Sequence, residues 1–191
     1  MQKPIFAITG SPGTGKTTLA YILAQSLDYQ IHHYNASSKR TRGIEFVEEE
    51  IIPLAHSGLD NVIILLDEAD QLTLAAQSAL KGVIEGSSCY FILTCNDLSK
   101  ISRWLQSRCS VRTFKPHTVE SAVKTMRDIL KSESMNVGDE ELTNLARIHQ
   151  GDLRNTIGAL QTLCYLNEEE SKKFLLEMEK VLTLPVICAY L

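Results

Sequence analysis

An eight-residue glycine-rich motif constrains the fold of this chain more than any other feature of its sequence. Residues 10–17 read G-S-P-G-T-G-K-T and match the pattern G-x-x-x-x-G-K-[ST]. A short apolar run at residues 5–9 precedes the motif, and apolar residues at helical spacing follow it between Leu19 and Leu27. A strand, a glycine-rich turn and a helix in this order place backbone N–H groups where they can surround phosphate oxygens. The motif therefore predicts a phosphate-binding loop.

The residue types in this loop suit a nucleoside triphosphate bound with a divalent cation. The Lys16 side chain can place a full positive charge beside phosphate oxygens, and the Thr17 hydroxyl can act as a ligand of Mg²⁺. We therefore predict ATP and Mg²⁺ as ligands. The loop residues expected to contact the nucleotide are Gly10, Ser11, Pro12, Gly13, Thr14, Gly15, Lys16, Thr17 and Thr18.

Two adjacent carboxylates follow a strongly apolar segment further along the chain. Residues 62–66 are five aliphatic residues in a row, and Asp67 and Glu68 come directly after them. Ligands bind beyond the carboxyl ends of the strands in parallel α/β sheets. We predict that Asp67 acts toward Mg²⁺ and that Glu68 activates the water that attacks the γ-phosphate. Asn96 ends a second apolar segment, residues 90–95, and is expected level with Glu68.

The apolar segments of the first half predict an α/β fold. Residues 62–66 and 90–95 show no polar alternation, as expected of parallel strands that are buried on both faces. Apolar residues at helical spacing between them, over residues 72–84, predict a connecting helix. Residues 29–35 and 111–114 are weaker strand candidates. This order predicts a parallel sheet with helices on both faces.

The pattern changes to helices alone in the second half of the chain. Three residues that favour helix N-caps each precede apolar residues at helical spacing: Thr118, Asp139 and Asp152. We predict an ATPase core at residues 1–115, a three-helix lid domain at residues 116–166 and a C-terminal helical tail at residues 167–191.

The composition excludes several classes of protein. The 191 residues include 23 acidic and 19 basic side chains, a net charge of −4, and 44% are hydrophobic, which excludes disordered and collagen-like chains. No apolar run approaches the ~20 residues of a membrane span, and residues 1–8 lack the features of a secretory signal. Five cysteines without metal-ligand spacing indicate free thiols in the cytoplasm, or in the nucleus of a eukaryote. His32 and His33 also lack metal-ligand neighbours, and we expect a structural role for them.

Five sequence elements occur in an order and at separations that are typical of one family. Together they resemble the AAA+ ATPases of the sliding-clamp loader family, most of all the replication factor C small subunits of archaea and eukaryotes and their phage equivalents. The resemblance covers about residues 5–166, and its most specific part is the Ser-Arg-Cys element. The five elements are residues 10–17, residues 67–70 (D-E-A-D), residues 93–96 (L-T-C-N), residues 107–109 (S-R-C) and residues 151–154 (G-D-L-R).

The resemblance implies roles for three residues outside the loop. Asn96 matches sensor 1, which helps to orient the lytic water. Arg108 matches the arginine finger, which in the family reaches the γ-phosphate held by the neighbouring subunit. Arg154 matches sensor 2, which contacts the nucleotide bound to its own chain. A structural alternative remains open for both arginines: Arg108 on a solvated basic face, and Arg154 as an exposed residue at a helix start.

Further positions match family segments that respond to DNA. Asn35 matches the residue that can hold the catalytic glutamate away until DNA is bound. Arg42 and Lys81 match segments that line the inside of the loader and follow the DNA backbone. Gly82 replaces a second arginine that is common in the family. An ordinary solvated basic surface is the alternative for Arg42 and Lys81.

We predict a clamp-loader small subunit that binds and hydrolyses ATP to load a sliding clamp onto primer–template DNA. The expected partners are other loader subunits, the clamp and the DNA, with no membrane. The family's segment ahead of the first strand and its helical collar domain are expected to be missing from this chain. Alternatives are another AAA+ DNA machine, such as a helicase loader or branch-migration motor, and a nucleotide-dependent interaction module with negligible turnover. A small-molecule kinase explains neither Glu68 nor Arg108.

Overall fold

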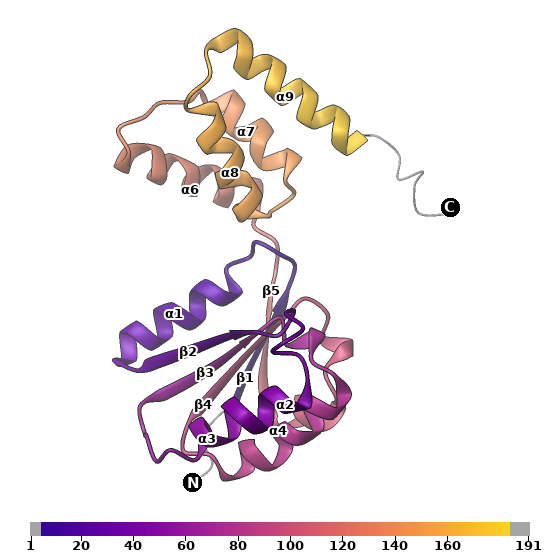
Figure 1. Ribbon diagram of the computed structural model, residues 1–191. Helices are drawn as coiled ribbons and strands as arrows, with labels where there is room; N and C mark the ends of the chain where they lie inside the picture. Colours follow the sequence, from indigo (N-terminus) through magenta and orange to yellow (C-terminus); the bar gives the residue numbers. More distant parts are fainter. Residues whose placement is uncertain (1–4, 184–191) are drawn as a thin grey trace, which may run out of the picture. The chain divides into compact units, whose positions relative to one another are not determined.

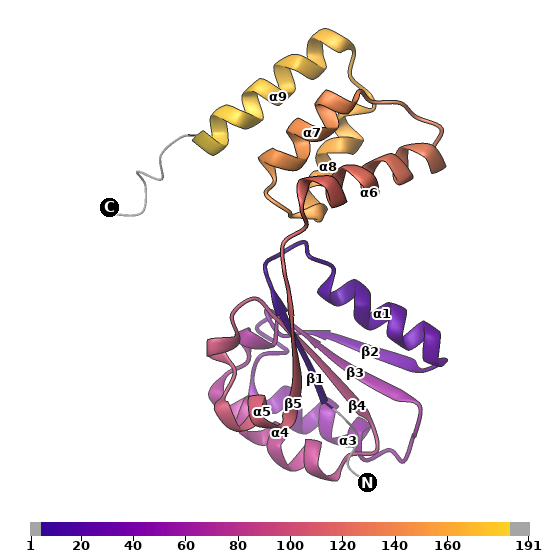
Figure 2. The same cartoon turned by 180° about the vertical axis from the view of Figure 1, so that it is seen from behind.

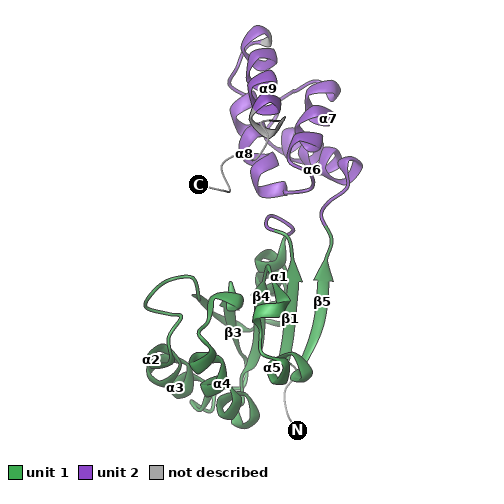
Figure 3. Cartoon of the chain, turned by 90° about the vertical axis from the view of Figure 1, so that its right-hand side faces the viewer, with its two compact units in different colours: residues 1–11, 15–115 green, residues 12–14, 116–191 purple. Residues whose placement is uncertain are grey.

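The computed structural model describes residues 5–183, which form two compact units. Within the described residues, unit 1 holds the chain up to residue 11 and residues 15–115, and unit 2 holds residues 12–14 and the chain from residue 116 onward (Figure 3). The backbone therefore enters unit 2 briefly at residues 12–14 and passes into it again between Lys115 and Pro116.

Unit 1 is built on a sheet of five parallel strands (Figure 1). Their order across the sheet is β2-β3-β4-β1-β5, so β4 lies between β3 and β1. Both weaker strand candidates are present, as β2 and β5. The parallel sheet confirms the predicted α/β class. The strands are β1 (Ile5–Gly10), β2 (Gln30–Asn35), β3 (Val62–Asp67), β4 (Tyr90–Cys95) and β5 (Cys109–Phe114).

Helices cover both faces of this sheet (Figures 1 and 2). Helix α1 (Lys16–Leu27) covers one face. Single turns of 3-10 helix, η2 (Ala69–Gln71) and η3 (Leu98–Lys100), follow β3 and β4. The other face is covered by α2 (Ile44–Phe46), the π-helical turn η1 (Val47–Ile51), α3 (Ile52–Ala55), α4 (Leu74–Gly86) and α5 (Arg103–Arg108).

Strand β3 shows how its sequence fits this three-layer arrangement. Ile64 and Leu66 pack into the core beneath the helices α2 to α5, whereas Ile63 and Leu65 pack against α1. Successive side chains of a strand point to opposite faces, so a strand covered on both faces must be apolar at every position. The unbroken aliphatic run therefore follows from the position of β3 inside the sheet.

The described part of unit 2 consists of four helices with one apolar core. Met126, Leu145 and Leu160 come from three different helices and are almost completely buried in it. Leu175 of the last helix packs into the same core, which gives that helix a packing partner. The helices are α6 (Val119–Ser132), α7 (Asp139–Ile148), α8 (Leu153–Leu163) and α9 (Glu168–Thr183). Residues 184–191 of the predicted tail lie outside the described residues.

Two of the three predicted N-caps of unit 2 are present. The Thr118 hydroxyl accepts a hydrogen bond from the Ser121 N–H, and the Asp152 carboxylate accepts one from the Asn155 N–H. The prediction for Asp139 was wrong by one position: Gly138 is the N-cap and Asp139 begins the helix. The Asp139 carboxylate pairs with Arg127 of α6 at 2.8 Å instead.

Candidate functional site

Predicted site residues line the carboxyl edge of the sheet in unit 1. Asn35 and Asp67 are register partners at the ends of β2 and β3. Asn96 follows β4 directly, and the β4–β1 register ends with Thr9 beside Cys95. The strand order therefore aligns the ends of β2, β3, β4 and β1, and the glycine-rich loop follows the last of these.

The backbone has positive φ at all three glycines of the loop, and Gly15 and Gly10 show why glycine is needed there. Gly15 is the N-cap of α1 and has φ of 89°. Residues other than glycine rarely adopt this left-handed backbone conformation. At Gly10, with φ of 152°, an added Cβ would lie 2.4 Å from the Phe114 carbonyl oxygen. Glycine therefore lets β1 and β5 approach closely where the loop begins.

The Lys16 ammonium is the central contact of the loop. Only 8% of the residue is exposed. Its Nζ donates to the carbonyl oxygens of Gly10 and Ser11, at 2.8 and 2.9 Å, and to Oδ1 of Asn96 at 2.9 Å. A buried ammonium is tolerated only where oxygens replace its lost hydration. These contacts join the start of the loop to the residue predicted as sensor 1.

The side chains of Thr17 and Asp67 form a set of oxygens that fits Mg²⁺. The Thr17 hydroxyl lies 3.0 and 3.1 Å from the two Asp67 carboxylate oxygens. Mg²⁺ is usually held by one or two carboxylates together with substrate phosphates and water, rather than by a cage of protein ligands. Among residues 5–183, no group of three or more His, Cys, Asp or Glu side chains is placed to hold a metal.

Thr94 of β4 organises the two adjacent acidic residues. Its hydroxyl donates to Oδ1 of Asp67 and accepts from the backbone N–H of Glu68 at 3.2 Å. Glu68 has φ of 54°, and a left-handed conformation costs a residue other than glycine roughly 1–3 kcal/mol. The Thr94 contact helps to hold this conformation directly after Asp67. Backbone strain of this kind gathers at functional sites.

Asn35 is engaged in its own turn. Its Oδ1 accepts from the Ser37 N–H at 2.8 Å, and its carbonyl oxygen accepts from the Thr41 hydroxyl. In the described part of the chain, no recorded hydrogen bond joins Asn35 to Glu68. The structure therefore places Asn35 beside Asp67 in the sheet register without the contact that the family resemblance implies.

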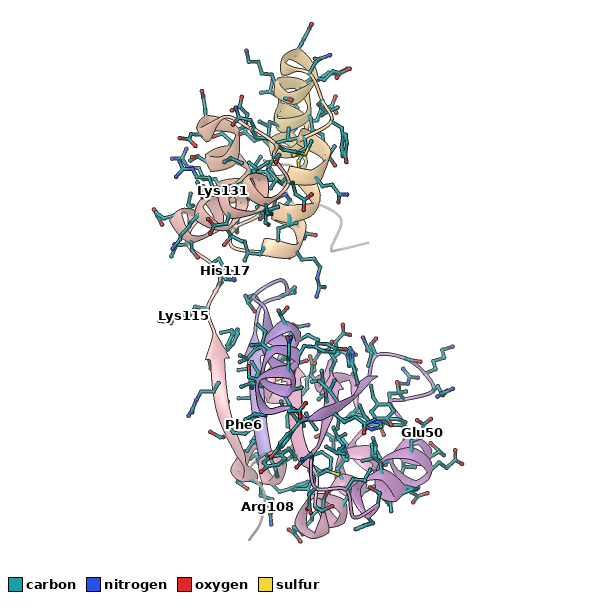
Figure 4. All side chains as sticks on the ribbon, turned by 90° about the vertical axis from the view of Figure 1, so that its left-hand side faces the viewer. Phe6, Glu50, Arg108, Lys115, His117 and Lys131 are labelled. Carbon is teal, nitrogen blue, oxygen red and sulfur yellow. The ribbon has the colours of Figure 1, made fainter. Side chains whose placement is uncertain are left out.

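Arg108 lies at the opposite edge of the sheet. It immediately precedes β5, and the β1–β5 register pairs Ile5 with Cys109 and Gly10 with Phe114. Six residue steps at about 3.3 Å each separate Arg108 from the level of Gly10, or about 20 Å. Figure 4 shows Arg108 and Lys115 at opposite ends of β5. The Arg108 guanidinium is therefore remote from the Lys16 loop of its own chain.

The Arg108 side chain is held by neighbours from α4 and α5. Its Nη2 and Nε lie 2.9 and 3.1 Å from Oε1 of Glu85, and its Nη1 donates to the Trp104 carbonyl oxygen at 3.2 Å. The guanidinium carbon also lies 5.7 Å from the centre of the Trp104 ring. These contacts order an arginine whose side chain is still 34% exposed.

The two predicted DNA-contacting segments are adjacent. The Arg42 carbonyl oxygen accepts from the N–H of Thr73, the N-cap of α4, at 2.9 Å. Lys81 is exposed on the same helix, as is Arg42 on its loop. The nearby Arg40 is paired with Glu50 at 2.9 Å, which reduces its contribution to a basic surface. Arg154 is exposed in unit 2, at the second position of α8.

Gln77 makes contacts that the sequence does not reveal. It is buried in α4, where its Nε2 donates to the carbonyl oxygens of Leu72 and Lys100, and its Oε1 accepts from the Ser102 N–H at 2.8 Å. The side chain thereby ties α4 to the segment between Asn96 and α5. A glutamine on the apolar face of a predicted helix was the only local signal of this role.

Two thiols, Cys95 at the site edge of the sheet and Cys109 beside Arg108, are both unreactive. Burial raises the pKa of the Cys95 thiol and raises the pKa of the Cys109 thiol to about 11. Both therefore stay neutral at pH 7, and neither is a candidate nucleophile. The described cysteines are all free, whereas Cys188 lies outside the described residues.

Comparisons with known proteins relate the chain to one family of ATPases. The model of the "ATPase family associated with various cellular activities (AAA)" matches residues 6–117. The replication factor C small subunit of Archaeoglobus fulgidus is 37% identical over 174 residues, which is 86% of this chain and 54% of that protein. Replication factor C subunit 4 of Encephalitozoon cuniculi is 37% identical over 166 residues, which is 83% of this chain and 53% of that protein.

These relatives confirm the resemblance to replication factor C small subunits. The chain spans about half the length of the curated relatives it matches. A single-residue variant of RuvB from Thermotoga maritima superposes with a TM-score of 0.76 at 18% identity, over 94% of this chain and 62% of that one. That likeness shows the fold alone. Within residues 5–183, no helix is both long enough and apolar enough to cross a bilayer.

Replacement of Thr94 by valine tests the packing of this site. The substitution keeps the shape but removes the donor to Asp67 and the acceptor for the Glu68 N–H, so we expect a loss of about 1–3 kcal/mol in the free energy of unfolding. Urea titrations followed by the fluorescence of Trp104, the single tryptophan, report on unit 1. Thr113→Val, at an exposed position of β5, is the matched control and should change the free energy of unfolding by less than about 0.5 kcal/mol. Equal effects of both substitutions would contradict the role of Thr94.

Proposed function

We propose, from the premise that this chain belongs to the AAA family of ATPases, that it binds ATP with Mg²⁺ and hydrolyses it at a site completed by a second subunit. The proposal is supported first by the chemistry gathered at one edge of the sheet. Lys16, Asp67, Glu68 and Asn96 supply the charge, carboxylates and amide that phosphoryl transfer to water requires.

Binding of the triphosphate begins with Lys16. Its ammonium already has neutral oxygens of the loop and of Asn96 as acceptors. A phosphate oxygen carries negative charge and attracts the ammonium more strongly than a neutral carbonyl or amide oxygen does, so it can replace one of these partners at a net gain. Thr17 and Asp67 would hold Mg²⁺, which neutralises charge on the phosphates when bound.

Hydrolysis then needs a positioned water. Glu68 acts as the general base for that water, and Asn96 orients it from the adjacent strand end. Glu68 follows directly after Asp67, the carboxylate proposed for the metal, and its left-handed backbone is held in part by Thr94. Arg154 of α8 is proposed as sensor 2 because the family resemblance assigns that role to its position.

The separation between Arg108 and Lys16 is the observation that carries the proposal of a shared site. An arginine finger about 20 Å from its own phosphate loop along β5 can act only on a nucleotide held by a neighbour. Arg108 is also exposed and pre-ordered by Glu85 and Trp104 at the surface of α5. On this proposal, the guanidinium exchanges Glu85 for a phosphate oxygen when two subunits meet.

The finer role that we propose is that of a clamp-loader small subunit. The replication factor C relatives support this role. Its partners are other loader subunits, a sliding clamp and primer–template DNA. Arg42 and Lys81 are the proposed backbone contacts, and the loop–helix hydrogen bond between Arg42 and Thr73 keeps their segments together. Asn35 is the proposed switch that restrains Glu68 until DNA binds, and its present partner is Ser37.

Removal of the Lys16 side chain tests nucleotide binding. Lys16→Ala should weaken binding of a fluorescent ATP analogue in Mg²⁺ by roughly 10- to 100-fold, because charge-assisted hydrogen bonds contribute about 1.5–3 kcal/mol. Lys39→Ala, at an exposed position, is the control and should bind like the wild type. An unchanged affinity of Lys16→Ala would overturn the assignment of the loop.

Removal of the Arg108 side chain tests the shared site. In assemblies with partner subunits, clamp and primed DNA, Arg108→Ala should bind ATP normally but hydrolyse it roughly 10³-fold more slowly. Arg103→Ala, an exposed arginine of the same helix, controls for loss of surface charge. Normal turnover by the assembled Arg108→Ala protein would show that the finger is assigned wrongly.

A further inference from the structure

We infer that His33 is a positioning residue for the Asp67 carboxylate, and that Tyr21 holds His33 in the orientation this requires. The sequence predicted only a structural role for this histidine, within a strand. The inference rests on the proposed function, because it takes Asp67 to be the carboxylate that serves Mg²⁺. The proposed function assigns no role to His33 or Tyr21.

The sheet register places His33 next to Asp67. His33 of β2 pairs with Leu65 of β3, and Asn35 pairs with Asp67 two residues further on. Side chains two residues apart on a strand lie on one face, which here is the face covered by α1, where Leu65 packs. Nε2 of His33 lies 3.4 Å from Oδ2 of Asp67.

Helix α1 supplies the second partner from a position one turn beyond Thr17. Residues four apart on a helix share a face, so Thr17 and Tyr21 both face this side of the sheet. The Tyr21 hydroxyl lies 2.7 Å from Nδ1 of His33, and the two rings meet edge to face with centres 5.7 Å apart. Thr17 and Tyr21 thus hold Asp67 from two sides, one directly and one through His33.

The two contacts of His33 are chemically consistent with each other. When the Tyr21 hydroxyl donates to Nδ1, the neutral imidazole carries its proton on Nε2, the nitrogen that lies 3.4 Å from Oδ2 of Asp67. Oδ1 of Asp67, the other carboxylate oxygen, accepts a hydrogen bond from the Thr94 hydroxyl. Each carboxylate oxygen therefore has a neighbour from a different strand, which fixes the plane of the carboxylate before any metal arrives.

Burial alone does not explain these contacts. The His33 side chain is 31% exposed, so water could satisfy its nitrogens, yet both lie near protein atoms. The adjacent His32 is on the opposite face of the same strand, and its buried Nε2 has no hydrogen-bond partner. Partners that orient metal-binding carboxylates typically change metal affinity 10- to 100-fold when they are removed.

The test measures the Mg²⁺ requirement of nucleotide binding rather than turnover. A fluorescent ATP analogue is titrated into the full chain in EDTA and at increasing Mg²⁺ concentrations. His33→Ala should raise the Mg²⁺ concentration at the midpoint by about tenfold or more while affinity in EDTA stays unchanged. Tyr21→Phe should shift the midpoint in the same direction by a smaller factor. His32→Ala, the matched control on the other face, should leave it unchanged.

Two results would overturn the inference. One is a wild-type Mg²⁺ midpoint in His33→Ala. The other is an equal loss of affinity in EDTA and in Mg²⁺, because this would show a general structural role for the histidine. Wild-type protein that binds no nucleotide in either condition would instead contradict the proposed function, so the two failures are distinct.

Discussion

The burial of the Lys16 ammonium is the constraint on which the geometry of the site depends. A charged amine with 8% of its residue exposed needs oxygens around it, and these come from the end of β1, from the loop and from Asn96 after β4. They can converge only because β4 is the direct neighbour of β1 in the sheet. On its other side, β4 is the neighbour of β3, which carries Asp67 and Glu68 at its end. One buried charge thus links the strand order to the chemistry.

The sequence was most informative where local pattern and burial coincide. The unbroken aliphatic run at residues 62–66 predicted a strand covered on both faces, and the structure confirms it. The N-cap at Asp139 was misplaced because Asp and Gly are both acceptable caps, and the pairing of Asp139 with Arg127 depends on a helix that is distant in sequence. The apolar spacing predicted a helix from residue 72 onward, but α4 begins at Leu74, after the 3-10 turn at residues 69–71. Apolar spacing alone does not reveal such a turn.

Positions of site residues could be predicted from sequence, but their partners could not. Residues that end apolar strands meet at one edge in any parallel sheet, which brought Asp67 and Asn96 close to the loop. By contrast, the Glu85 partner of Arg108 and the contacts of Gln77 and His33 link segments far apart in the sequence. No local periodicity encodes such pairs. The separation of Arg108 from Lys16 likewise emerged only from the β1–β5 register.

Complementation between two inactive variants tests the shared nucleotide site most directly. Lys16→Ala protein lacks the proposed phosphate contact but keeps the proposed finger, whereas Arg108→Ala protein keeps the loop and lacks the proposed finger. When they are mixed with partner subunits, clamp and primed DNA, a site formed by the loop of one and Arg108 of the other is complete. The account predicts that ATP hydrolysis by the mixture clearly exceeds the sum of the two variants assayed alone. A mixture no more active than that sum, while wild-type protein is active under the same conditions, would contradict it.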